Sequence, residues 1–403
     1  MRHLRGIFRR HIPKFVLNAC WHLPRAVIAV YWFRFPARRL TVVAVAGTKG
    51  KTTTTILTAR MLAAAGHRTA CVSTAVVRLG DREELNALKM TTPSAWWLQR
   101  FLRRAVAAGC THAVLEVSSH ALLQHRTFGI PFAAAVLTTI MPDHLEYHRT
   151  AKEYQETHRK LCVPSLRTLV LNGDDEHLQS FACADVPTRT FSVHGAMADR
   201  IRALPLLLLG EHNIANAAAA ATVTEAIGVR WDAIAAALSD SESVPGRLER
   251  IDAGQPFTVI VDYAHSPESL TSAFDAVAVL QPKRIITVFG ACGERDPNRR
   301  PPMGTILDAR SDIVIVTNDD PYGEDPEQIA AGLLSGITNK TRDQNLFVIL
   351  DRRAAIAKAC TLAQSGDLVL IAGKGAEQWQ VFKNRKIPWD DRVVAREEIA
   401  KIC

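Results

Sequence analysis

A run of seven residues early in the chain has the composition of a loop that binds the phosphates of a nucleotide. The run reads Gly47-Thr48-Lys49-Gly50-Lys51-Thr52-Thr53 and follows an apolar stretch, 41–45, that is typical of a buried parallel strand. Glycines allow backbone N–H groups to converge on an anion, a lysine can reach the terminal phosphates, and a hydroxyl can bind Mg²⁺. The glycine spacing is two residues shorter than in the common G-x-x-x-x-G-K-[ST] loop. We therefore predict a nucleotide-binding loop at the start of a helix over 51–66.

Carboxylate and imidazole groups follow two later apolar stretches. Glu116 ends the stretch 111–115, and Asp143 and His144 follow the stretch 132–139. The carboxyl ends of parallel strands form the edge at which an open α/β sheet binds its ligands. We therefore predict that Glu116 binds Mg²⁺ and that His144 or Asp143 makes a second metal or phosphate contact. A glutamate that caps a helix and a solvated turn are the structural alternatives.

The second half of the chain also alternates apolar strands with helices. Asn213 and Asn216 lie three positions apart in an alanine-rich helix, so their amides share a face that could read an adenine edge. A polar break at 239–243 predicts a domain boundary. Beyond it, polar clusters fall at the ends of predicted strands, at 262–265, 290–296, 318–321 and 373–377. These patterns predict an α/β fold with a P-loop central ATPase domain and a Rossmann-like, doubly wound C-terminal domain.

The net charge of +9 is concentrated at the N-terminus. Residues 1–40 hold nine Lys or Arg and no Asp or Glu, whereas the remaining 40 basic residues are matched by 40 acidic ones. This distribution argues against a nucleic-acid-binding groove. The uncharged stretch 15–24 is too short to span a bilayer. We expect residues 1–40 either to pack on the domain as a helix or to lie on an anionic membrane as a basic, aromatic-rich helix.

Length and cysteine usage are typical of an intracellular protein of several domains. A chain of 403 residues can build two or three hydrophobic cores. We divide it into a basic, aromatic leader (1–40), a central ATP-binding domain (41–243) and a C-terminal domain (244–403). The eight cysteines form no C-x-x-C pair, so we expect reduced, buried side chains and a cytoplasmic location.

Twelve motifs in order resemble those of the Mur ligase family, and most of all its tripeptide-synthetase branch. They are GTKGKTTT, TTPS, EVSSHALLQHR, DHLEYH, GEHNIANAAAA, VPGRLE, DYAHSPESL, VFGACGERDPNRRPPMG, DDPYGEDP, DRRAAI, AGKGAE and DDRVVARE. The resemblance runs from about residue 41 to the C-terminus, and so many motifs in one order make it specific. It implies a ligase in which ATP phosphorylates the carboxylate of a muramyl-peptide acceptor. The amine of an incoming amino acid would then displace the phosphate.

The resemblance also implies roles for individual residues. Lys51 and the backbone of 47–53 would hold the ATP phosphates. Thr52 and Glu116 would bind one Mg²⁺, and His144 would bind a second. The remaining ATP contacts would be Asn213, Asn216, Arg247, Asp262 and His265. The acceptor would contact Thr91, Thr92, Ser118, Gln124 and Arg126, and the amino acid would contact Arg300, Asp319, Asp320, Gly373 and Glu377.

The sequence departs from the family pattern at three places. The family's N-terminal domain, which binds the uridine diphosphate part of the acceptor, is not found, so the basic leader favours a membrane-held acceptor. Four residues after Tyr154, where the family has a carbamylated lysine, this chain has His158, with Lys160 two further on; both are candidate catalytic residues. Tyr322 replaces the arginine that binds the distal carboxylate of diaminopimelate, and Ala376 replaces a common histidine. We therefore expect lysine or a neutral amino acid as substrate.

We expect a cytoplasmic ligase of peptidoglycan biosynthesis that uses ATP and Mg²⁺, with peripheral membrane contact through residues 1–40 and no nucleic-acid partner. One alternative is a related ligase acting on a lipid-linked acceptor or on another carboxylate, such as a folate or a poly-amino-acid chain. Another alternative is a nucleotide-binding partner subunit without independent catalysis. ATP turnover that requires both acceptor and amino acid would distinguish the ligases from the partner subunit.

Overall fold

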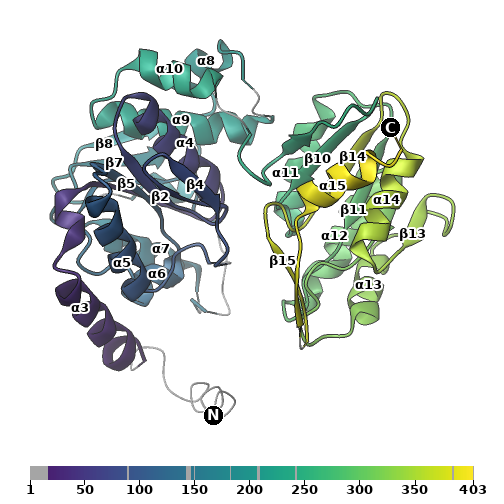
Figure 1. Cartoon of the computed structure of the whole chain (residues 1–403), viewed down its shortest axis with the longest axis horizontal. Coiled ribbons are helices and arrows are strands. Elements are labelled where there is room, and N and C mark those ends of the chain that lie inside the picture. The colour runs from purple at the N-terminus through teal and green to yellow at the C-terminus, as the bar shows by residue number, and fades with distance from the viewer. Residues whose placement is uncertain are drawn as a thin grey trace. The chain divides into compact units, whose positions relative to one another are not determined.

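The computed structural model describes residues 17–402, except 89, 142–146, 149, 182, 207–208, 241–242 and 384. The chain forms two compact units (Figure 1). The N-terminal unit contains Met1–Leu206 and Asn213–Ser241, and the C-terminal unit contains Leu207–His212 and Glu242–Cys403.

The N-terminal unit is built on a sheet whose described strands lie in the order β4-β3-β2-β5-β1-β6-β7-β8. Their bounds are β1 (Thr41–Ala46), β2 (Thr69–Val72), β3 (Val76–Leu79), β4 (Arg82–Leu85), β5 (His112–Glu116), β6 (Phe132–Leu137), β7 (Thr168–Asn172) and β8 (Thr188–Phe191). The strands from β2 to β8 in this order run parallel, whereas β3 and β4 form an antiparallel edge. The predicted apolar strand at 41–45 thus lies inside the sheet, where it pairs with β5 and β6.

Helices cover both faces of this sheet (Figure 1). One face carries α5 (Ala95–Ala107), α6 (Ser119–Leu123) and α7 (Ala151–His158), and the other carries α4 (Lys51–Ala64), α9 (Glu211–Ala226) and α10 (Trp231–Ser239). Alternate residues of β1 face opposite ways, so Val42 and Ala44 share a core with Leu98 and Phe101 of α5. Outside this layer, α3 (Leu23–Trp32) packs on α5. The shorter helical segments are η1 (Asn18–His22), η2 (Pro36–Arg39), η3 (Arg159–Leu161), η4 (Glu176–Leu178) and α8 (Ala196–Arg202).

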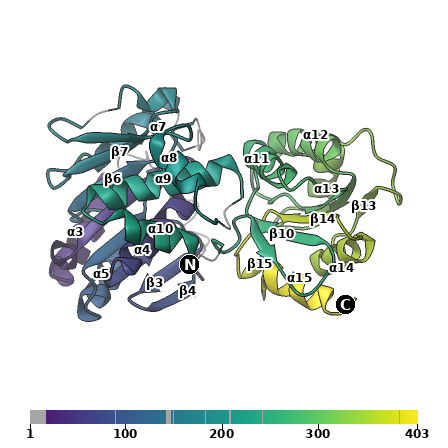
Figure 2. The same ribbon diagram turned by 90° about the horizontal axis from the view of Figure 1, so that it is seen from above.

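The C-terminal unit has a sheet in the order β13-β12-β11-β14-β10-β9, with all neighbours parallel except β9 and β10. The strands are β9 (Glu249–Ile251), β10 (Thr258–Asp262), β11 (Ile285–Phe289), β12 (Ile313–Val316), β13 (Leu346–Val348) and β14 (Leu368–Ala372), with a separate hairpin of β15 (Trp379–Phe382) and β16 (Arg385–Pro388). The helices are α11 (Pro267–Ala278), η5 (Pro297–Arg299), α12 (Arg300–Arg310), α13 (Pro326–Leu334), α14 (Arg352–Leu362) and α15 (Asp391–Ile399). Two hydrophobic cores form, one under α11, α12 and α13 and one under α14 and α15 (Figure 2).

The predicted α/β fold is confirmed in both units. The antiparallel strands β3, β4, β15 and β16 were not predicted. In β4 and β16 most residues are exposed, whereas β3 and β15 are largely apolar and partly buried but only four residues long. The prediction that all cysteines are reduced was wrong for one pair, since Cys162 and Cys183 form a disulfide with Cα atoms 5.4 Å apart. No helix in the described part of the chain combines the length and the apolar character needed to cross a membrane.

Candidate active site

The loop between β1 and α4 has the backbone shape of an anion site. Gly47 and Gly50 have φ of +130° and +81°, a region that favours glycine. A Cβ at Gly47 would collide with Thr138 Oγ1, and one at Gly50 would collide with Asn216 Oδ1. The two glycines therefore allow a tight turn that ends at the N-terminus of α4, where the helix dipole favours an anion.

Neighbouring strand ends hold this loop in place. The hydroxyl of Thr48 lies 2.9 Å from the Tyr154 hydroxyl of α7, and the N–H of Lys49 donates to Thr139 Oγ1 at 3.1 Å. Lys51 Nζ donates to the Thr48 carbonyl at 2.7 Å. The lysine therefore folds back over the loop, at the position from which it can meet a terminal phosphate.

Glu116 and Thr52 meet beside the loop. Thr52 Oγ1 donates to Glu116 Oε1 at 3.0 Å, and both side chains are buried. Thr74 contributes a second hydroxyl at 3.1 Å from Glu116 Oε1 and a backbone N–H at 2.5 Å from Oε2. Glu116 does not cap α6, because Ser118 does so by accepting from the Ala121 N–H. An all-oxygen set of a carboxylate and hydroxyls fits a bound Mg²⁺.

The five residues predicted to bind the acceptor form one hydrogen-bond network with Glu116. Thr92 Oγ1 donates to the Glu116 carbonyl at 2.9 Å and accepts from the Ser118 N–H at 2.9 Å. Arg126 donates to the Thr92 carbonyl at 2.5 Å and to Gln124 Oε1 at 2.6 Å. The fifth residue, Thr91, accepts from the Thr74 hydroxyl at 3.0 Å. The network therefore joins the β5 end to the segment that follows α6.

The residues proposed to replace the carbamylated lysine lie in different environments. His158 is fully buried at the end of α7, and its Nδ1 lies 2.9 Å from the Tyr154 carbonyl. Its Nε2 has no hydrogen-bond partner among the described residues. Burial, with the charge of Lys51 as a smaller cause, lowers the pKa of His158 to about 4. Lys160 is exposed in η3, and His144 lies outside the described residues.

Aromatic and imidazole rings connect the acceptor residues with the P-loop. His120 and Tyr147 have ring centroids 4.1 Å apart, and His148 lies 5.1 Å from Tyr154. Tyr154 in turn lies 4.9 Å from His158. Tyr147 and Tyr154 also use their hydroxyls, on Gln124 and Thr48. The sequence motif predicted polar chemistry in this segment, but not that its rings pack in a row.

The two asparagines of α9 lie against the P-loop. Asn216 Nδ2 donates to Asn213 Oδ1 at 3.3 Å, and both residues are buried. The Asn216 carbonyl accepts from Thr54 Oγ1 at 3.4 Å, which ties α9 to α4. Their contact with adenine stays a prediction.

In the C-terminal unit, one buried lysine collects three carboxylates. Lys374 Nζ lies 3.0 Å from Asp319 Oδ1, 2.9 Å from Asp320 Oδ1 and 2.9 Å from Glu377 Oε2. Burial alone would lower the pKa of Lys374, but the three carboxylates outweigh it and raise the pKa well above its ordinary value. Asp319 and Asp320 are buried, whereas the Glu377 side chain is 22% exposed. Glu377 is thus the carboxylate of the cluster that solvent or a ligand can reach.

Arg300 is engaged by a residue of its own unit. Its guanidinium pairs with both carboxylate oxygens of Glu324, at 2.6 and 2.8 Å. The same pairing lowers the pKa of Glu324. Gly373, with φ of +117°, would place a Cβ 3.0 Å from Asp319 Oδ2. The predicted amino-acid contacts therefore lie at the ends of β12 and β14 and at the start of α12.

The other predicted ATP contacts of this unit are Asp262 at the end of β10, His265 after this strand and Arg247 before β9. Asp262 accepts from the backbone N–H of Leu248 and of Ala264, both at 2.8 Å. The Arg247 guanidinium lies 4.6 Å from the centre of the Tyr263 ring, and His265 lies 4.7 Å from the same ring. Asp262 therefore holds the backbone next to Arg247 by accepting a hydrogen bond from Leu248.

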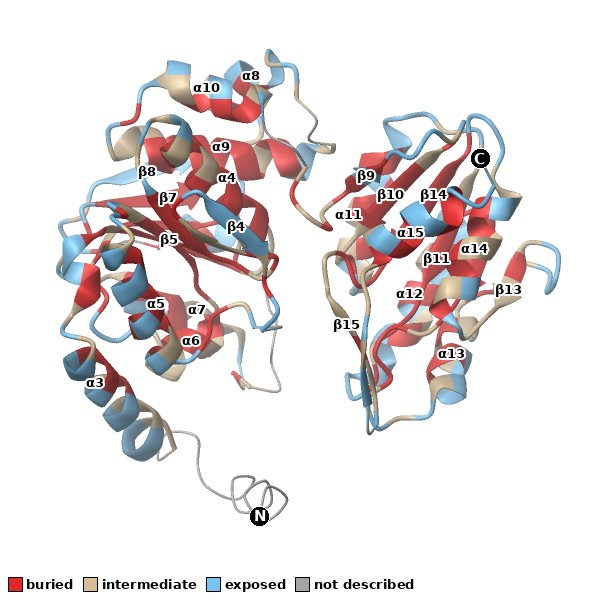
Figure 3. Ribbon diagram, in the orientation of Figure 1, coloured by how far each residue is buried: buried red, intermediate tan, exposed pale blue. Residues whose placement is uncertain are grey.

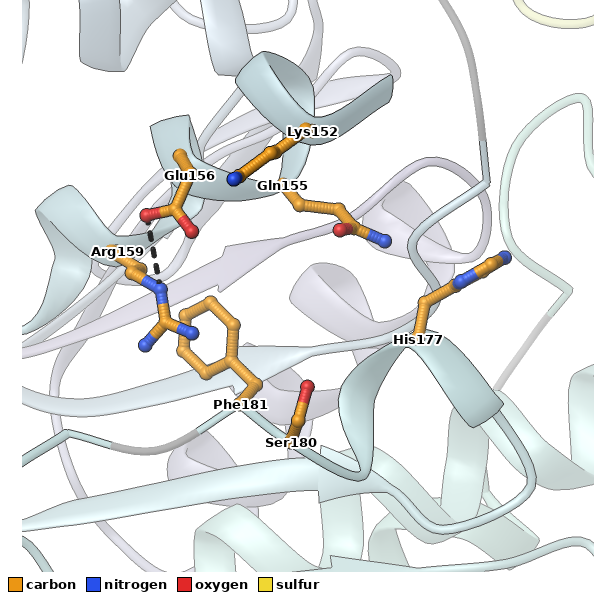
Figure 4. A pocket seen from close by; sticks show the side chains of 7 residues that line it. All are labelled: Lys152, Gln155, Glu156, Arg159, His177, Ser180 and Phe181. Atoms are coloured by element: carbon orange, nitrogen blue, oxygen red, sulfur yellow. Dashed lines mark ion pairs between the residues drawn. The ribbon is translucent and has the colours of Figure 1, made fainter. Parts of the chain in front are cut away.

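A surface pocket lies elsewhere, on the outer side of α7 (Figure 4). Its lining residues are Lys152, Gln155, Glu156, Arg159, His177, Ser180 and Phe181. Arg159 pairs with Glu156 at 3.1 Å. Tyr154 and His158 project from the buried side of the same helix, so this pocket is separate from the P-loop.

Comparisons with known proteins agree with this geometry. Residues 45–224 match the Mur ligase middle domain, and residues 246–375 match the glutamate ligase domain of Mur ligases. The UDP-N-acetylmuramoyl-L-alanyl-D-glutamate–2,6-diaminopimelate ligase of Geobacillus kaustophilus is 37% identical over 93% of this chain and 82% of its own. The chain belongs to the Mur ligase family. This Mur ligase is also 36% identical to the UDP-N-acetylmuramyl-tripeptide synthetase of Roseiflexus sp., over 94% of this chain and 82% of the relative.

Solved structures of Mur ligases and of a folylpolyglutamate synthase have a fold similar to that of this Mur ligase. A UDP-N-acetylmuramoyl-L-alanyl-D-glutamate–2,6-diaminopimelate ligase matches with a TM-score of 0.60 and 30% identity, over 90% of this chain and 79% of the other. Mycobacterium tuberculosis folylpolyglutamate synthase, solved with ADP and AMPPCP, matches with a TM-score of 0.69 and 20% identity, over 87% and 92%. The second likeness concerns the fold alone. The predicted enzyme class, an ATP-dependent ligase, is confirmed by family membership.

Three residues of this Mur ligase's site were not singled out from the sequence. Thr74 lies in an unremarkable loop, and only the folded chain brings it to Glu116. Lys374 and Glu324 lie inside the motifs AGKGAE and DDPYGEDP, so these motifs could have indicated both residues as part of the site. What the motifs did not show is which carboxylate each cation pairs with.

Proposed function

We propose that this Mur ligase joins an amino acid to the carboxylate of a muramyl-peptide precursor. The acceptor carboxylate takes the γ-phosphoryl group of ATP, ADP leaves, and the amine of the amino acid attacks the acyl carbon and releases phosphate and a proton. The observation that supports this best is the contact of Thr52 with Glu116 beside Lys51, in a chain that matches Mur ligases over most of its length. The named relatives act on UDP-N-acetylmuramoyl-L-alanyl-D-glutamate.

The chain's own groups would act by electrostatics rather than by covalent chemistry. Lys51 and the backbone of 50–53 at the N-terminus of α4 would hold the β- and γ-phosphates and balance the charge that moves with the phosphoryl group. The N–H groups of Thr48 and Lys49 donate to Thr139 instead. Thr52 and Glu116 would hold Mg²⁺, which supplies further charge neutralisation when bound. The short bonds that Glu116 accepts from Thr74 keep its carboxylate oriented toward Thr52.

A second metal contact is proposed for the His158 region. His158 is neutral near pH 7 because its pKa is about 4, and its Nε2 is available for a proton or an ion. His144 from the same motif stays a predicted ligand. Exchange of His158 or Lys160 for glutamine distinguishes the two candidates. We expect H158Q to reduce kcat, whereas K160Q, at an exposed position, has little effect.

The acceptor is proposed to bind along Thr92, Ser118 and Arg126. Arg126 carries a positive charge at the end of the network that begins at Glu116. A guanidinium in this place suits the carboxylates of a peptide. The acceptor is either UDP-linked or lipid-linked, and turnover with each of the two distinguishes them. We also propose a cytoplasmic location with peripheral membrane contact through residues 1–40.

The incoming amino acid is proposed to be lysine or a neutral amino acid. The Lys374 cluster holds three carboxylates against one ammonium, so it attracts the amine of the substrate, with Glu377 as the accessible group. Arg300 is bound by Glu324, and Tyr322 stands where the diaminopimelate-adding members have an arginine. A second carboxylate on the substrate would therefore lack its usual guanidinium partner. Diaminopimelate is the alternative substrate, because relatives of this chain are named as diaminopimelate ligases.

The test is phosphate release from ATP with a panel of substrates, followed by product mass. Acceptors are a UDP-linked and a lipid-linked muramyl-dipeptide, and amino acids are lysine, diaminopimelate and alanine. We expect turnover that requires both an acceptor and lysine or alanine, and Y322R to shift the preference toward diaminopimelate. Turnover with diaminopimelate alone would overturn the amino-acid assignment. Nucleotide binding without turnover on any pair would favour the partner-subunit alternative.

A further inference from the structure

The helix α3 presents its largest side chains to solvent. Its buried residues are the small Ala26, Ala29 and Val30, which pack toward the rest of the unit. On its outer side, Ile28 is 57% exposed and Trp32 is 70% exposed. A helix that serves only its own domain buries the large apolar residues and exposes small or polar ones. In α3 this order is inverted (Figure 3).

The exposed apolar surface continues onto α5. The Trp96 ring lies 5.9 Å from the Trp32 ring and 5.0 Å from the Phe33 ring, and Trp96 is itself 45% exposed. Val30 contacts the turn at Gly129, beside which Phe128 is 40% exposed. Large apolar side chains of α3 and α5 therefore meet at one face, and Phe128 is exposed in the turn that packs on α3.

Every charge that this face carries is positive. Arg25 on α3 and Arg100, Arg103 and Arg104 on α5 are exposed, and Trp96, Arg100, Arg103 and Arg104 recur at helical spacing. The chain has no Asp or Glu in 1–40, 86–115 or 117–141, the stretches that contain these three segments. Within these three segments no carboxylate offsets the arginines.

We propose that this face, formed by α3, α5 and the turn at 128–129, is a docking surface for an anionic lipid bilayer. Tryptophan and tyrosine are favoured at the membrane interface, and arginines bind anionic headgroups. A second copy of the chain fits less well, because a symmetric contact would bring the same arginines face to face without any carboxylate to pair with them. The surface extends beyond residues 1–40 to α5, and it does not depend on the ligase reaction.

The test is co-sedimentation of the full chain with vesicles of phosphatidylcholine or of equimolar phosphatidylcholine and phosphatidylglycerol. We expect binding to the anionic vesicles that falls with salt and is absent with pure phosphatidylcholine. Two variants probe the apolar and the charged parts separately, I28E/W32E and R100Q/R103Q/R104Q. Each should lower the apparent partition coefficient at least about tenfold. The matched control is V279E, since Val279 is 72% exposed in the C-terminal unit and should bind like the wild type.

Two measurements keep failure of this inference distinct from failure of the proposed ligase reaction. Ligase turnover on a soluble acceptor should be unchanged in I28E/W32E, which also shows that the variant is folded. Vesicle binding that is equal in wild type and both variants, or absent from anionic vesicles, would overturn the inference. Self-association without vesicles that I28E/W32E abolishes would assign the face to a second copy of the chain instead. Binding of a single-stranded oligonucleotide as tight as that of anionic vesicles would also overturn it.

Discussion

The guanidinium of Arg352 pairs with the carboxylate of Asp391 at 2.7 and 2.8 Å, and both side chains are completely buried. Arg352 also donates to the carbonyls of Asn318 and Ala372, which follow β12 and end β14. One buried cation thereby joins α14, α15 and the two strand ends that lead to the Lys374 cluster. The backbone that follows β12 and the end of β14 are thus both hydrogen-bonded to one buried guanidinium.

Breaking this pair should destabilise the C-terminal unit strongly. We expect R352M to lower the free energy of unfolding by about 3–5 kcal/mol, because Asp391 is left as an unpaired buried charge. Urea denaturation followed by circular dichroism measures this loss. The double variant R352M/D391L should be more stable than R352M, since no charge remains buried. A double variant as unstable as the sum of both single losses would contradict the explanation.

The fit of Gly50 against Asn216 should make nucleotide binding sensitive to one methyl group. We expect G50A to weaken ATP binding at least about tenfold, because Ala disfavours the positive φ and its Cβ collides with the Asn216 amide. Isothermal titration with ATP measures the change. Combining G50A with N216A should restore part of the affinity by removing the collision, while the backbone strain remains. The control is G66A. Gly66 also has a positive φ, but a Cβ at this position would meet no neighbour within 4 Å, and the position is far from the loop.

The Lys374 cluster should control the affinity for the amino acid but not for ATP. We expect K374M to raise KM for the amino acid at least about tenfold, with KM for ATP nearly unchanged, because the carboxylates that Lys374 orients would repel one another. Steady-state kinetics with each substrate varied in turn measures this difference. K401M is the matched control, since Lys401 is 62% exposed and its partner Glu398 keeps a second ion pair, with Arg353 at 2.8 Å. Equal changes in both KM values would instead indicate a general loss of folding.

His158 should make the N-terminal unit sensitive to acid. Its pKa falls from an ordinary 6.5 to about 4 on folding, so the unfolded chain takes up this proton first as the pH drops. The contribution of neutral His158 is complete above pH 6.5 and is lost progressively toward pH 4, by about 3 kcal/mol in total. Unfolding midpoints between pH 7 and pH 4 should fall less steeply in H158Q than in the wild type. In H194Q, which removes an exposed histidine, the slope should match the wild type.

The Cys162–Cys183 disulfide should stabilise the segment that includes β7. The bond closes a loop with a sequence separation of 21, for which about 3 kcal/mol is typical. We expect C183S to lower the free energy of unfolding by roughly this amount under oxidising conditions only. Thermal unfolding with and without a reductant measures it. No difference between wild type and C183S in oxidising buffer would show that the bond does not contribute.

Much of the fold could be predicted from the sequence because buried parallel strands are local patterns. The apolar stretches at 41–45, 111–115 and 258–261 became β1, β5 and β10 almost to the residue. The short strands β3 and β15 could not, since each is only four residues long, and neither could β4 and β16, which have no buried residue. Hydrogen bonds to their neighbours decide these strands, and sequence patterns do not record such bonds.

For the site, residue type and order along the chain determined the chemistry. Lysine, threonine and glycine at 47–53, with Glu116 at a strand end, already predicted that an anion and a cation are bound together. Only the tertiary structure decided the pairings: Thr74 on Glu116, Glu324 on Arg300, and three carboxylates on Lys374. The physical reason is that a strand-end loop exposes many polar groups of similar type. Two such groups pair only when their atoms lie about 3 Å apart. The order of the strands and the packing of the helices decide which residues, far apart in the chain, come this close.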